Sequence, residues 1–487
     1  MQIKKRIAVV AASILAVGAA AGLASCGSSN FDGILIWGPE EHEEVYLNAI
    51  EQYKADHPDF KVEVRFAAQG DAGANDNVGK DVESAGSIVT FPNDQLISLK
   101  RMGALSKLTD ASVTWAKENN VLASVEAGKI GDGYYAYPIS ADNGFVFIFN
   151  RDAFKDTSVW DASKDGLKEG YTFRDLYKAL DERGAQAGHE KWANGKVIWP
   201  SGSAWYESGV FFATGGDYAV EYDEKGVQTK ATCNFGYNLK DDGSKDYSHG
   251  LDAIRAMMNT MTEEDGSVSK HFTYTDDTDP AYNDYVDDHI GNGSKANDEP
   301  LAGVVSWNNS KPKEAWGEDY DVEILPTLVA ESKLLGGDGT RYTWRSFSGF
   351  KLMGVNPFSA FARKAPENIV ILHELAQYLA GKDVSIKRYE KSNLGPSNLE
   401  AQEDERVKAD KFLNALNEQY SLKDASGNNI GFRVQDSTPA NFWTPIANFG
   451  KGVYEAVADG KTGGFNNLTN AQRMLNQLQF DIEASAD

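Results

Sequence analysis

The feature that most constrains the fold of this chain is a repeated alternation of short apolar strands with amphipathic helices. Residues 34–37 (ILIW) predict a buried strand, the segment after them places Tyr46, Ala49, Ile50 and Tyr53 on one helical face, and residues 62–66 alternate as a second strand. The order strand, helix, strand predicts a parallel βαβ unit. The chain is therefore expected to adopt an α/β fold.

The same order recurs further along the chain. Residues 86–91 (GSIVTF) lead into a predicted helix near 95–101, and residues 144–149 (GFVFIF) lead toward a predicted helix at 172–184. In that last helix Thr172 and Asp175 have the spacing of a capping box. We expect strands and helices to alternate through both halves of the molecule.

Helices are predicted to dominate the last quarter of the chain. Pro366 and Gly381 bracket one of them, and a closing helix has an apolar stripe at Leu468, Ala471, Leu475, Leu478 and Ile482. Two acidic segments between these regions, residues 221–250 and 275–289, are rich in turn formers and are predicted to be surface loops and hairpins.

The N-terminus has the pattern of an export signal. Lys4, Lys5 and Arg6 precede an uncharged run that ends at Leu23. A transmembrane helix is the competing interpretation, but much of the run is Ala and Gly, and small residues precede Cys26. Residues 23–26 (LASC) resemble the lipobox of bacterial lipoproteins. That resemblance implies a signal peptide at 1–25, a lipid anchor on Cys26 and a linker at 26–29.

Charge and cysteine content exclude several classes of protein. The formal charge is −24, and it becomes −27 when the three cations of the signal are removed. Such a surface repels phosphate backbones, so nucleic acid is not expected as a partner. Acylation of Cys26 would leave Cys233 without a partner in the chain, so we expect a buried thiol and no disulfide. A chain of 487 residues is long enough for two cores.

Motifs for covalent chemistry are missing from the sequence. His42 lacks the second histidine of a zinc helix, and no serine lies in a Gly-x-Ser-x-Gly turn. The acidic tract 276–288 does not have the spacing of an EF-hand loop, so a solvated loop is preferred to a calcium site. Paired carboxylates for glycoside hydrolysis stay open, because 72 acidic residues can supply a pair. No catalytic residue, metal or cofactor is predicted.

Aromatic residues next to polar ones are the more informative signal. The chain has 10 Trp, 21 Tyr and 23 Phe, several of them in loop-like stretches such as WPSGSAWY, VVSWNN, RYTWRSF and ANFWTP. Flat rings beside hydrogen-bonding groups suit sugars, whose C–H faces stack while their hydroxyls need polar partners. The alternative for any single Trp is a place in the core.

Several segments, in this order and spacing, resemble one family over nearly the whole mature chain. They include residues 34–64, 86–109, 128–154, 320–328, 346–359, 389–402 and 442–461. The family is the extracellular solute-binding proteins of ABC sugar importers, of the maltose and maltodextrin type. The resemblance implies two α/β lobes with a hinge and a ligand cleft between them. It places the N-terminal lobe at 30–140 and 353–398, and the C-terminal lobe at 143–352 and 399–487.

The resemblance also implies which residues contact the ligand. Carboxylates would accept hydrogen bonds from sugar hydroxyls and rings would stack on the sugar, at Glu41, Asp94, Asp142, Tyr206, Trp307 and Trp443. Two departures from the pattern leave the sugar open, since Phe91 stands where a Trp is often found and Gln95 where an Arg is common.

The function implied is capture without chemistry. Ligand would shift the hinge toward a closed form that docks on an ABC permease, and the protein would be a monomer, lipid-anchored on the extracellular face of the cytoplasmic membrane. The alternatives are a binding protein for a different oligosaccharide, a surface polysaccharide-capture protein without a transporter, and a lipid-anchored glycosidase.

Overall fold

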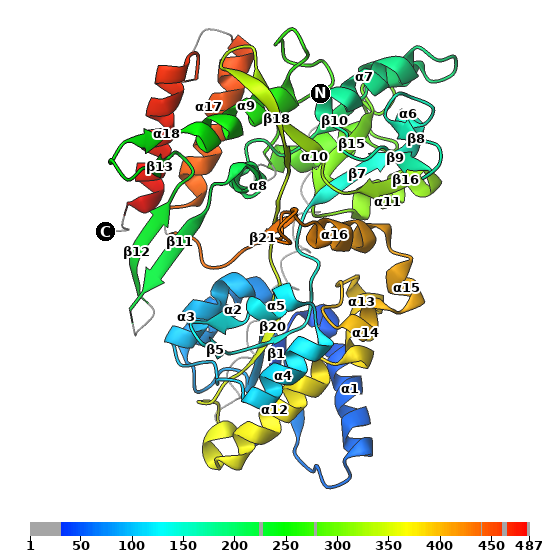
Figure 1. Cartoon of the computed structure of the whole chain (residues 1–487). Coiled ribbons are helices and arrows are strands. Elements are labelled where there is room, and N and C mark those ends of the chain that lie inside the picture. The colour runs from blue at the N-terminus through cyan, green and yellow to red at the C-terminus, as the bar shows by residue number, and fades with distance from the viewer. Residues whose placement is uncertain (1–30, 224–226, 277–279, 440, 460–464, 485–487) are drawn as a thin grey trace, which may run out of the picture.

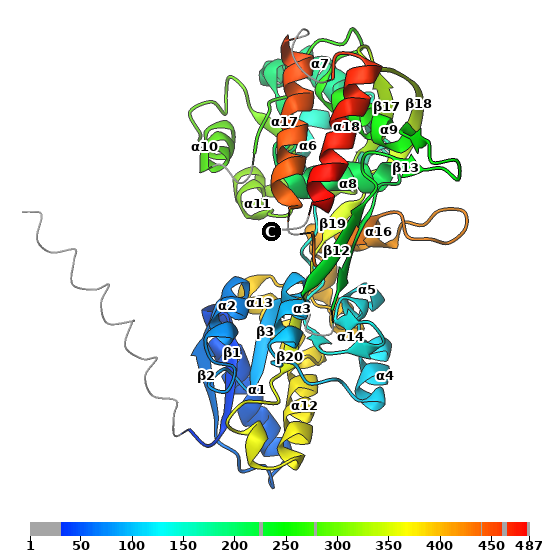
Figure 2. The same cartoon turned by 90° about the vertical axis from the view of Figure 1, so that its left-hand side faces the viewer.

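The computed structural model describes residues 31–223, 227–276, 280–439, 441–459 and 465–484, which form two α/β lobes joined at a waist (Figures 1 and 2). The predicted signal peptide, Cys26 and the linker lie outside these residues. Among the helices that are described, none is long and apolar enough to cross a membrane.

The N-lobe is built on a five-stranded sheet of order β2-β1-β3-β20-β6. Strand β1 pairs in parallel with β2 and β3, which confirms the predicted βαβ unit, whereas β20 runs antiparallel to both β3 and β6. The bounds are β1 Ile34–Gly38, β2 Val64–Ala68, β3 Ile88–Pro92, β6 Tyr137–Pro138 and β20 Lys351–Val355.

Helices cover both faces of this sheet. Ile88 packs on the side of α1 and α12, and the next residue, Val89, packs on the side of α2 and α3, as alternation along a strand requires. Tyr46, Ala49, Ile50 and Tyr53 of α1 are buried as predicted. The helices are α1 Glu43–Asp56, α2 Ala74–Lys80, α3 Leu96–Arg101, α4 Asp110–Asn119, α5 Leu122–Glu126, α12 Glu367–Leu379 and α13 Lys382–Ser392.

The C-lobe has a four-stranded sheet of order β10-β15-β7-β16. Strands β10 and β15 are parallel, and β7 runs antiparallel to both β15 and β16, so this sheet is mixed. The bounds are β7 Val146–Asn150, β10 Lys196–Ile198, β15 Leu301–Ser306 and β16 Tyr320–Glu323.

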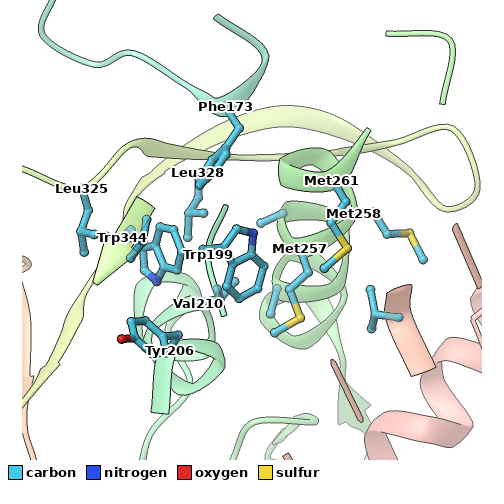
Figure 3. Packing of buried hydrophobic residues seen from close by; sticks show 14 of the residues in the cluster. Phe173, Trp199, Tyr206, Val210, Met257, Met258, Met261, Leu325, Leu328 and Trp344 are labelled. Carbon is cyan, nitrogen blue, oxygen red and sulfur yellow. The ribbon is translucent and has the colours of Figure 1, made fainter. Parts of the chain in front are cut away.

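The larger core of the C-lobe lies on one face of that sheet and contains Trp199, Trp344 and three methionines of α9 (Figure 3). Helix α7 begins at Thr172 with the predicted capping box, in which the Thr172 hydroxyl and the Asp175 carboxylate bond to each other's backbone. The helices are α6 Arg151–Phe154, α7 Phe173–Gly184, α8 Ala204–Thr214, α9 Ser248–Met261, α10 Pro280–His289, α11 Ser310–Trp316, α16 Lys411–Ser421, α17 Trp443–Asp459 and α18 Leu468–Glu483.

Small two-stranded pairs lie outside the two main sheets, with β4 and β5 in the N-lobe and the others in the C-lobe and at the waist (Figure 1). Cys233 ends one of them as a buried free thiol, as predicted, and the Phe235 amide donates to its Sγ at 3.4 Å. The pairs are β4 Lys129–Ile130 with β5 Gly133–Tyr134, β8 Trp160–Asp161 with β9 Gly166–Leu167, β11 Tyr218–Tyr222 with β12 Gln228–Cys233, β13 Asn238–Leu239 with β14 Lys245–Asp246, β17 Thr327–Ser332 with β18 Gly336–Thr343, and β19 Ser346–Ser348 with β21 Phe432–Val434.

Three sequence predictions need correction. The segment at 275–289 is not all loop, because Pro280 starts α10 and this helix buries Val286. Leu468 is 46% exposed, because it is the first residue of α18 and lies before the buried stripe begins. The lobe boundary placed between Leu352 and Met353 falls inside β20, all of which belongs to the N-lobe sheet.

The chain crosses between the lobes at residues that hold one another in place. The Ala141 amide donates to the Gly395 carbonyl at 3.0 Å, and the Gly349 amide donates to the Asn143 carbonyl at 2.7 Å. A Cβ on Gly395 would lie 2.7 Å from the Cβ of Asp142, so this close approach requires glycine. Short helices α14 Leu399–Gln402 and α15 Glu405–Lys408 then lead back to the C-lobe.

Candidate ligand-binding cleft

A cavity of about 740 Å³ lies between the lobes at these crossings. The crossings and the N-lobe contribute Asp142, Asn143, Lys351 and Ser392 to its wall, and the C-lobe contributes residues 307–310 and the start of α16. Its volume is in the range of about 300 to 1,000 Å³ that is usual for small-molecule sites. The cavity is therefore large enough for a few sugar rings and is reached by both lobes.

Two of the predicted ligand residues meet in this cavity. Trp307 directly follows the fully buried strand β15, and its side chain is 49% exposed. Asp142 lies on the first crossing, where its Oδ2 accepts the Gly395 amide at 2.9 Å. Burial raises the pKa of the Asp142 carboxyl, and the Gly395 hydrogen bond offsets part of that rise. The cavity thus combines an open aromatic ring with a fixed hydrogen-bond acceptor.

Glu41 and Asp94 lie at the cleft edge of the N-lobe sheet but do not line this cavity. Both are exposed, and they occupy short 3₁₀ turns, Glu40–His42 after β1 and Asn93–Gln95 after β3. Because β1 and β3 are parallel, their carboxyl ends lie at one edge of the sheet. The structure therefore places both carboxylates at the edge of the N-lobe sheet that faces the crossings, outside the cavity.

Tyr206 is not on the wall of the cleft. It lies in α8 with 1% of its surface exposed, among the buried residues that Figure 3 shows. Its ring centroid is 4.8 Å from that of Phe145 and 5.3 Å from that of Trp205. The reason is that α8 is apolar on nearly all sides and is enclosed by the C-lobe core. In this conformation Tyr206 offers almost no surface to a ligand, which corrects the expectation from the sequence.

Trp443 begins α17, whose first turn points toward the N-lobe (Figures 1 and 2). The ring is 36% exposed and packs edge to face on Phe442 at 5.0 Å. It lines a separate cavity of about 380 Å³ with Pro445 and Asp481. The predicted stripe behind it, Ile446, Phe449 and Val453, is buried, so Trp443 lies beside the stripe as expected.

The sequence did not identify two polar pairs on the N-lobe side of the cavity. Lys351 Nζ lies 3.6 Å from Asp71 Oδ2, and His42 Nε2 lies 2.8 Å from Ser392 Oγ. Burial, and then the charge of Arg388, lowers the pKa of His42. No local motif links the partners of either pair, because they come from segments far apart in the chain. Only the sheet and the crossings bring them together.

The described part of the chain contains no group of three or more histidine, cysteine, aspartate or glutamate side chains arranged to hold a metal ion.

The fold is similar to that of several solved structures. The maltodextrin-binding protein of L. casei, solved without ligand, is 17% identical over 93% of this chain and 99% of its own, with a TM-score of 0.65. The maltose-binding periplasmic protein of Listeria monocytogenes in complex with maltose is 16% identical over 93% and 98%, with a TM-score of 0.58. MalX of Streptococcus pneumoniae in complex with maltopentaose is 17% identical over 92% and 99%, with a TM-score of 0.56.

At these identities the likeness concerns the fold. No curated protein matches the chain in sequence. A family model described as bacterial extracellular solute-binding protein matches residues 48–415. That match covers most of the chain, including the N-lobe sheet from β2 on, the crossings and the cleft. The chain therefore belongs to the family of bacterial extracellular solute-binding proteins.

Proposed function

We propose that this protein captures an oligosaccharide, specifically a malto-oligosaccharide, in the cleft between its lobes and delivers it to an ABC transporter permease. The observation that carries the proposal is the half-exposed ring of Trp307 in a cavity that also holds Asp142 and Lys351. A flat apolar ring beside a carboxylate and an ammonium matches the alternating C–H faces and hydroxyls of a sugar. Maltose and maltopentaose in two of the neighbouring structures support the choice of α-glucan.

Binding would act through the hinge. The ligand would contact Trp307 on the C-lobe and Asp142 and Lys351 at the crossings, and these contacts would be complete only when the lobes close. A ligand shifts such an equilibrium by the difference between its affinities for the two forms. The closed form would then be the one that the permease recognises, so loading and delivery are coupled without covalent chemistry.

The anchor would keep this cycle close to the membrane. Strand β1 begins at Ile34, so about seven residues separate it from Cys26 and reach at most about 25 Å. Stable attachment needs two acyl chains or a second signal. Membrane fractionation of Cys26→Ala tests the anchor: the variant should leave the membrane fraction, and its retention there would contradict lipidation.

Calorimetric titration of the purified chain with maltose through maltopentaose tests the proposed ligand. Saturable binding is expected, and binding to the native state alone raises stability by about 2.7 kcal/mol when free ligand is a hundredfold above Kd. If a different oligosaccharide binds and α-glucans do not, the proposed ligand is wrong and the proposed oligosaccharide-binding function still holds. Release of shorter sugars during the titration would instead identify a glycosidase.

A further inference from the structure

Lys351 places an ammonium at the base of the cleft. Its backbone carbonyl accepts the Ile139 amide at 2.9 Å, which ties it to the first crossing. Its Nζ lies 3.6 Å from Asp71, whose side chain is only 11% exposed and accepts the Thr90 hydroxyl at 2.5 Å. The Asp71 carboxylate is therefore held in place without a ligand, and the Lys351 ammonium lies within ion-pair distance of it.

The charges around Lys351 are mostly negative. Desolvation by the surrounding protein raises the pKa of Asp142, and the charge of Lys351 offsets part of that rise. One ammonium therefore acts on Asp142 in addition to its contact with Asp71. The other cation near the base of the cleft, Arg388, is fully buried and bonds to two backbone carbonyls and the Ser385 hydroxyl, so it does not reach a ligand in the cavity.

On the C-lobe wall of the cavity, a lysine is again accompanied by carboxylates. Lys313 lies 3.8 Å from Asp410, and Glu314 follows it in α11. Among the described residues that line the cavity, two lysines stand against three carboxylates, and behind this wall Asp71 and the buried Arg388 carry opposite charges. A ligand carboxylate or sulfate in the cavity would therefore meet one more carboxylate than lysine on the wall.

We infer that the cleft selects uncharged oligosaccharides over acidic ones of the same size, and that the Lys351–Asp71 pair is the determinant of this selection. The inference rests on the proposed function and names its ligand class. A lysine ammonium has three donor hydrogens, so Lys351 can point at Asp71 and still donate to sugar hydroxyls. It cannot neutralise a ligand anion at the same time. Unpaired like charges brought together on binding are a common source of discrimination between ligands.

The test compares two sugars that differ in one group. Maltotriose and its analogue with a terminal glucuronic acid are titrated calorimetrically into the full mature chain at low salt. We expect the acidic sugar to bind about tenfold more weakly or worse, the equivalent of at least one unfavourable like-charge contact. Raising the salt concentration should reduce the difference between the two affinities. The electrostatic screening length falls to about 8 Å at 0.15 M salt and is shorter still at higher concentrations.

Variants locate the determinant. Asp71→Asn, which keeps the shape of the side chain, should improve binding of the acidic sugar severalfold and change maltotriose binding little. Lys351→Met should weaken the binding of both sugars, and that of the acidic sugar more. Glu63→Gln is the matched control, because Glu63 pairs with Arg65 at 2.7 Å in an exposed position just before β2, at the end of the strand away from the cleft. It should leave the ratio of affinities unchanged.

These measurements distinguish a failure of the inference on charge selection from a failure of the proposed function. Equal or tighter binding of the acidic sugar by the unmodified protein would overturn the inference and leave the proposed function standing. An unchanged ratio in Asp71→Asn, in protein whose melting temperature shows that it is folded, would also overturn the role of the pair. Binding of no oligosaccharide of either kind would overturn the proposed function, and the inference would fall with it.

Discussion

The segments that follow β10 and β15 have similar compositions but different environments. The two strands are parallel neighbours, so both segments leave the same edge of the C-lobe sheet. After β15 the chain turns outward, and the Trp307 ring faces the cavity of about 740 Å³ between the lobes, called the hinge cavity below. After β10 the chain enters the core, where Trp199 and Tyr206 are buried (Figure 3). An aromatic residue beside polar ones is therefore not enough to identify a binding platform.

The cause of the difference is what packs against each segment. Helix α8, which carries Tyr206, is covered by α9 and α17, and these helices come from later parts of the chain. The turn after β15 is held by its own polar groups, because the Asn308 amide donates to Ser306 Oγ at 3.1 Å and the Ser310 amide donates to Asn308 Oδ1 at 3.0 Å. Local bonding leaves the Trp307 ring free for the cavity.

The strongest effect should come from the buried residue Tyr206, and it should be on stability. Tyr206→Ala should lower the free energy of unfolding by about 3 to 5 kcal/mol, the usual cost of removing a large buried aromatic side chain. Urea denaturation measures it. Sugar affinity, determined where the variant is still folded, should stay near that of the unmodified protein. A marked loss of affinity with unchanged stability would show that Tyr206 reaches the ligand after all.

At Trp307 the opposite result is expected, a loss of affinity with little change in stability. Trp307→Ala should weaken malto-oligosaccharide binding by about 1 to 3 kcal/mol, by analogy with base stacking on aromatic side chains. Its unfolding free energy should change by no more than about 0.5 kcal/mol, as for other surface positions. Titration calorimetry and urea denaturation of the same preparation give both numbers. A large stability loss with intact affinity would assign Trp307 to the fold.

Trp443 is intermediate and should show the smallest effect. It is partly exposed, but its cavity is separate from the one at the hinge. Only a sugar long enough to extend beyond the hinge cavity would contact the ring. We therefore expect Trp443→Ala to weaken maltopentaose binding by about 1 kcal/mol, at the low end for a stacking contact, and to leave maltose binding unchanged. An equal loss for both sugars would place Trp443 in the same subsite as Trp307.

Local features of the fold could be predicted from the sequence, because their causes are local. The capping box at Thr172 and Asp175, the buried face of α1 and the thiol of Cys233 each follow from neighbouring residues or from composition. Helix α10 was missed because its acidic composition hid Val286, which faces the core.

The candidate site could be predicted only in part. Trp307 and Asp142 share a cavity, whereas Tyr206 is buried, because its helix is covered by α9 and α17 from later in the chain. The Lys351–Asp71 contact was not found, since it depends on β20 returning to the N-lobe sheet from late in the chain. Residues whose environment is set by distant segments require the structure.

If an α-glucan binds between the lobes and closes them, a distance measured across the cleft must shorten when the sugar binds. Glu44 on α1 and Lys311 on α11 have exposed side chains and form only surface ion pairs, so cysteines there can carry spin labels at little cost. Cys233 is buried and should not react. We expect maltotriose to shorten the distance between the labels when Trp307 is present, and Trp307→Ala to need more sugar for the same change. A distance that stays constant at saturating, calorimetrically verified maltotriose would contradict closure of the lobes on the sugar.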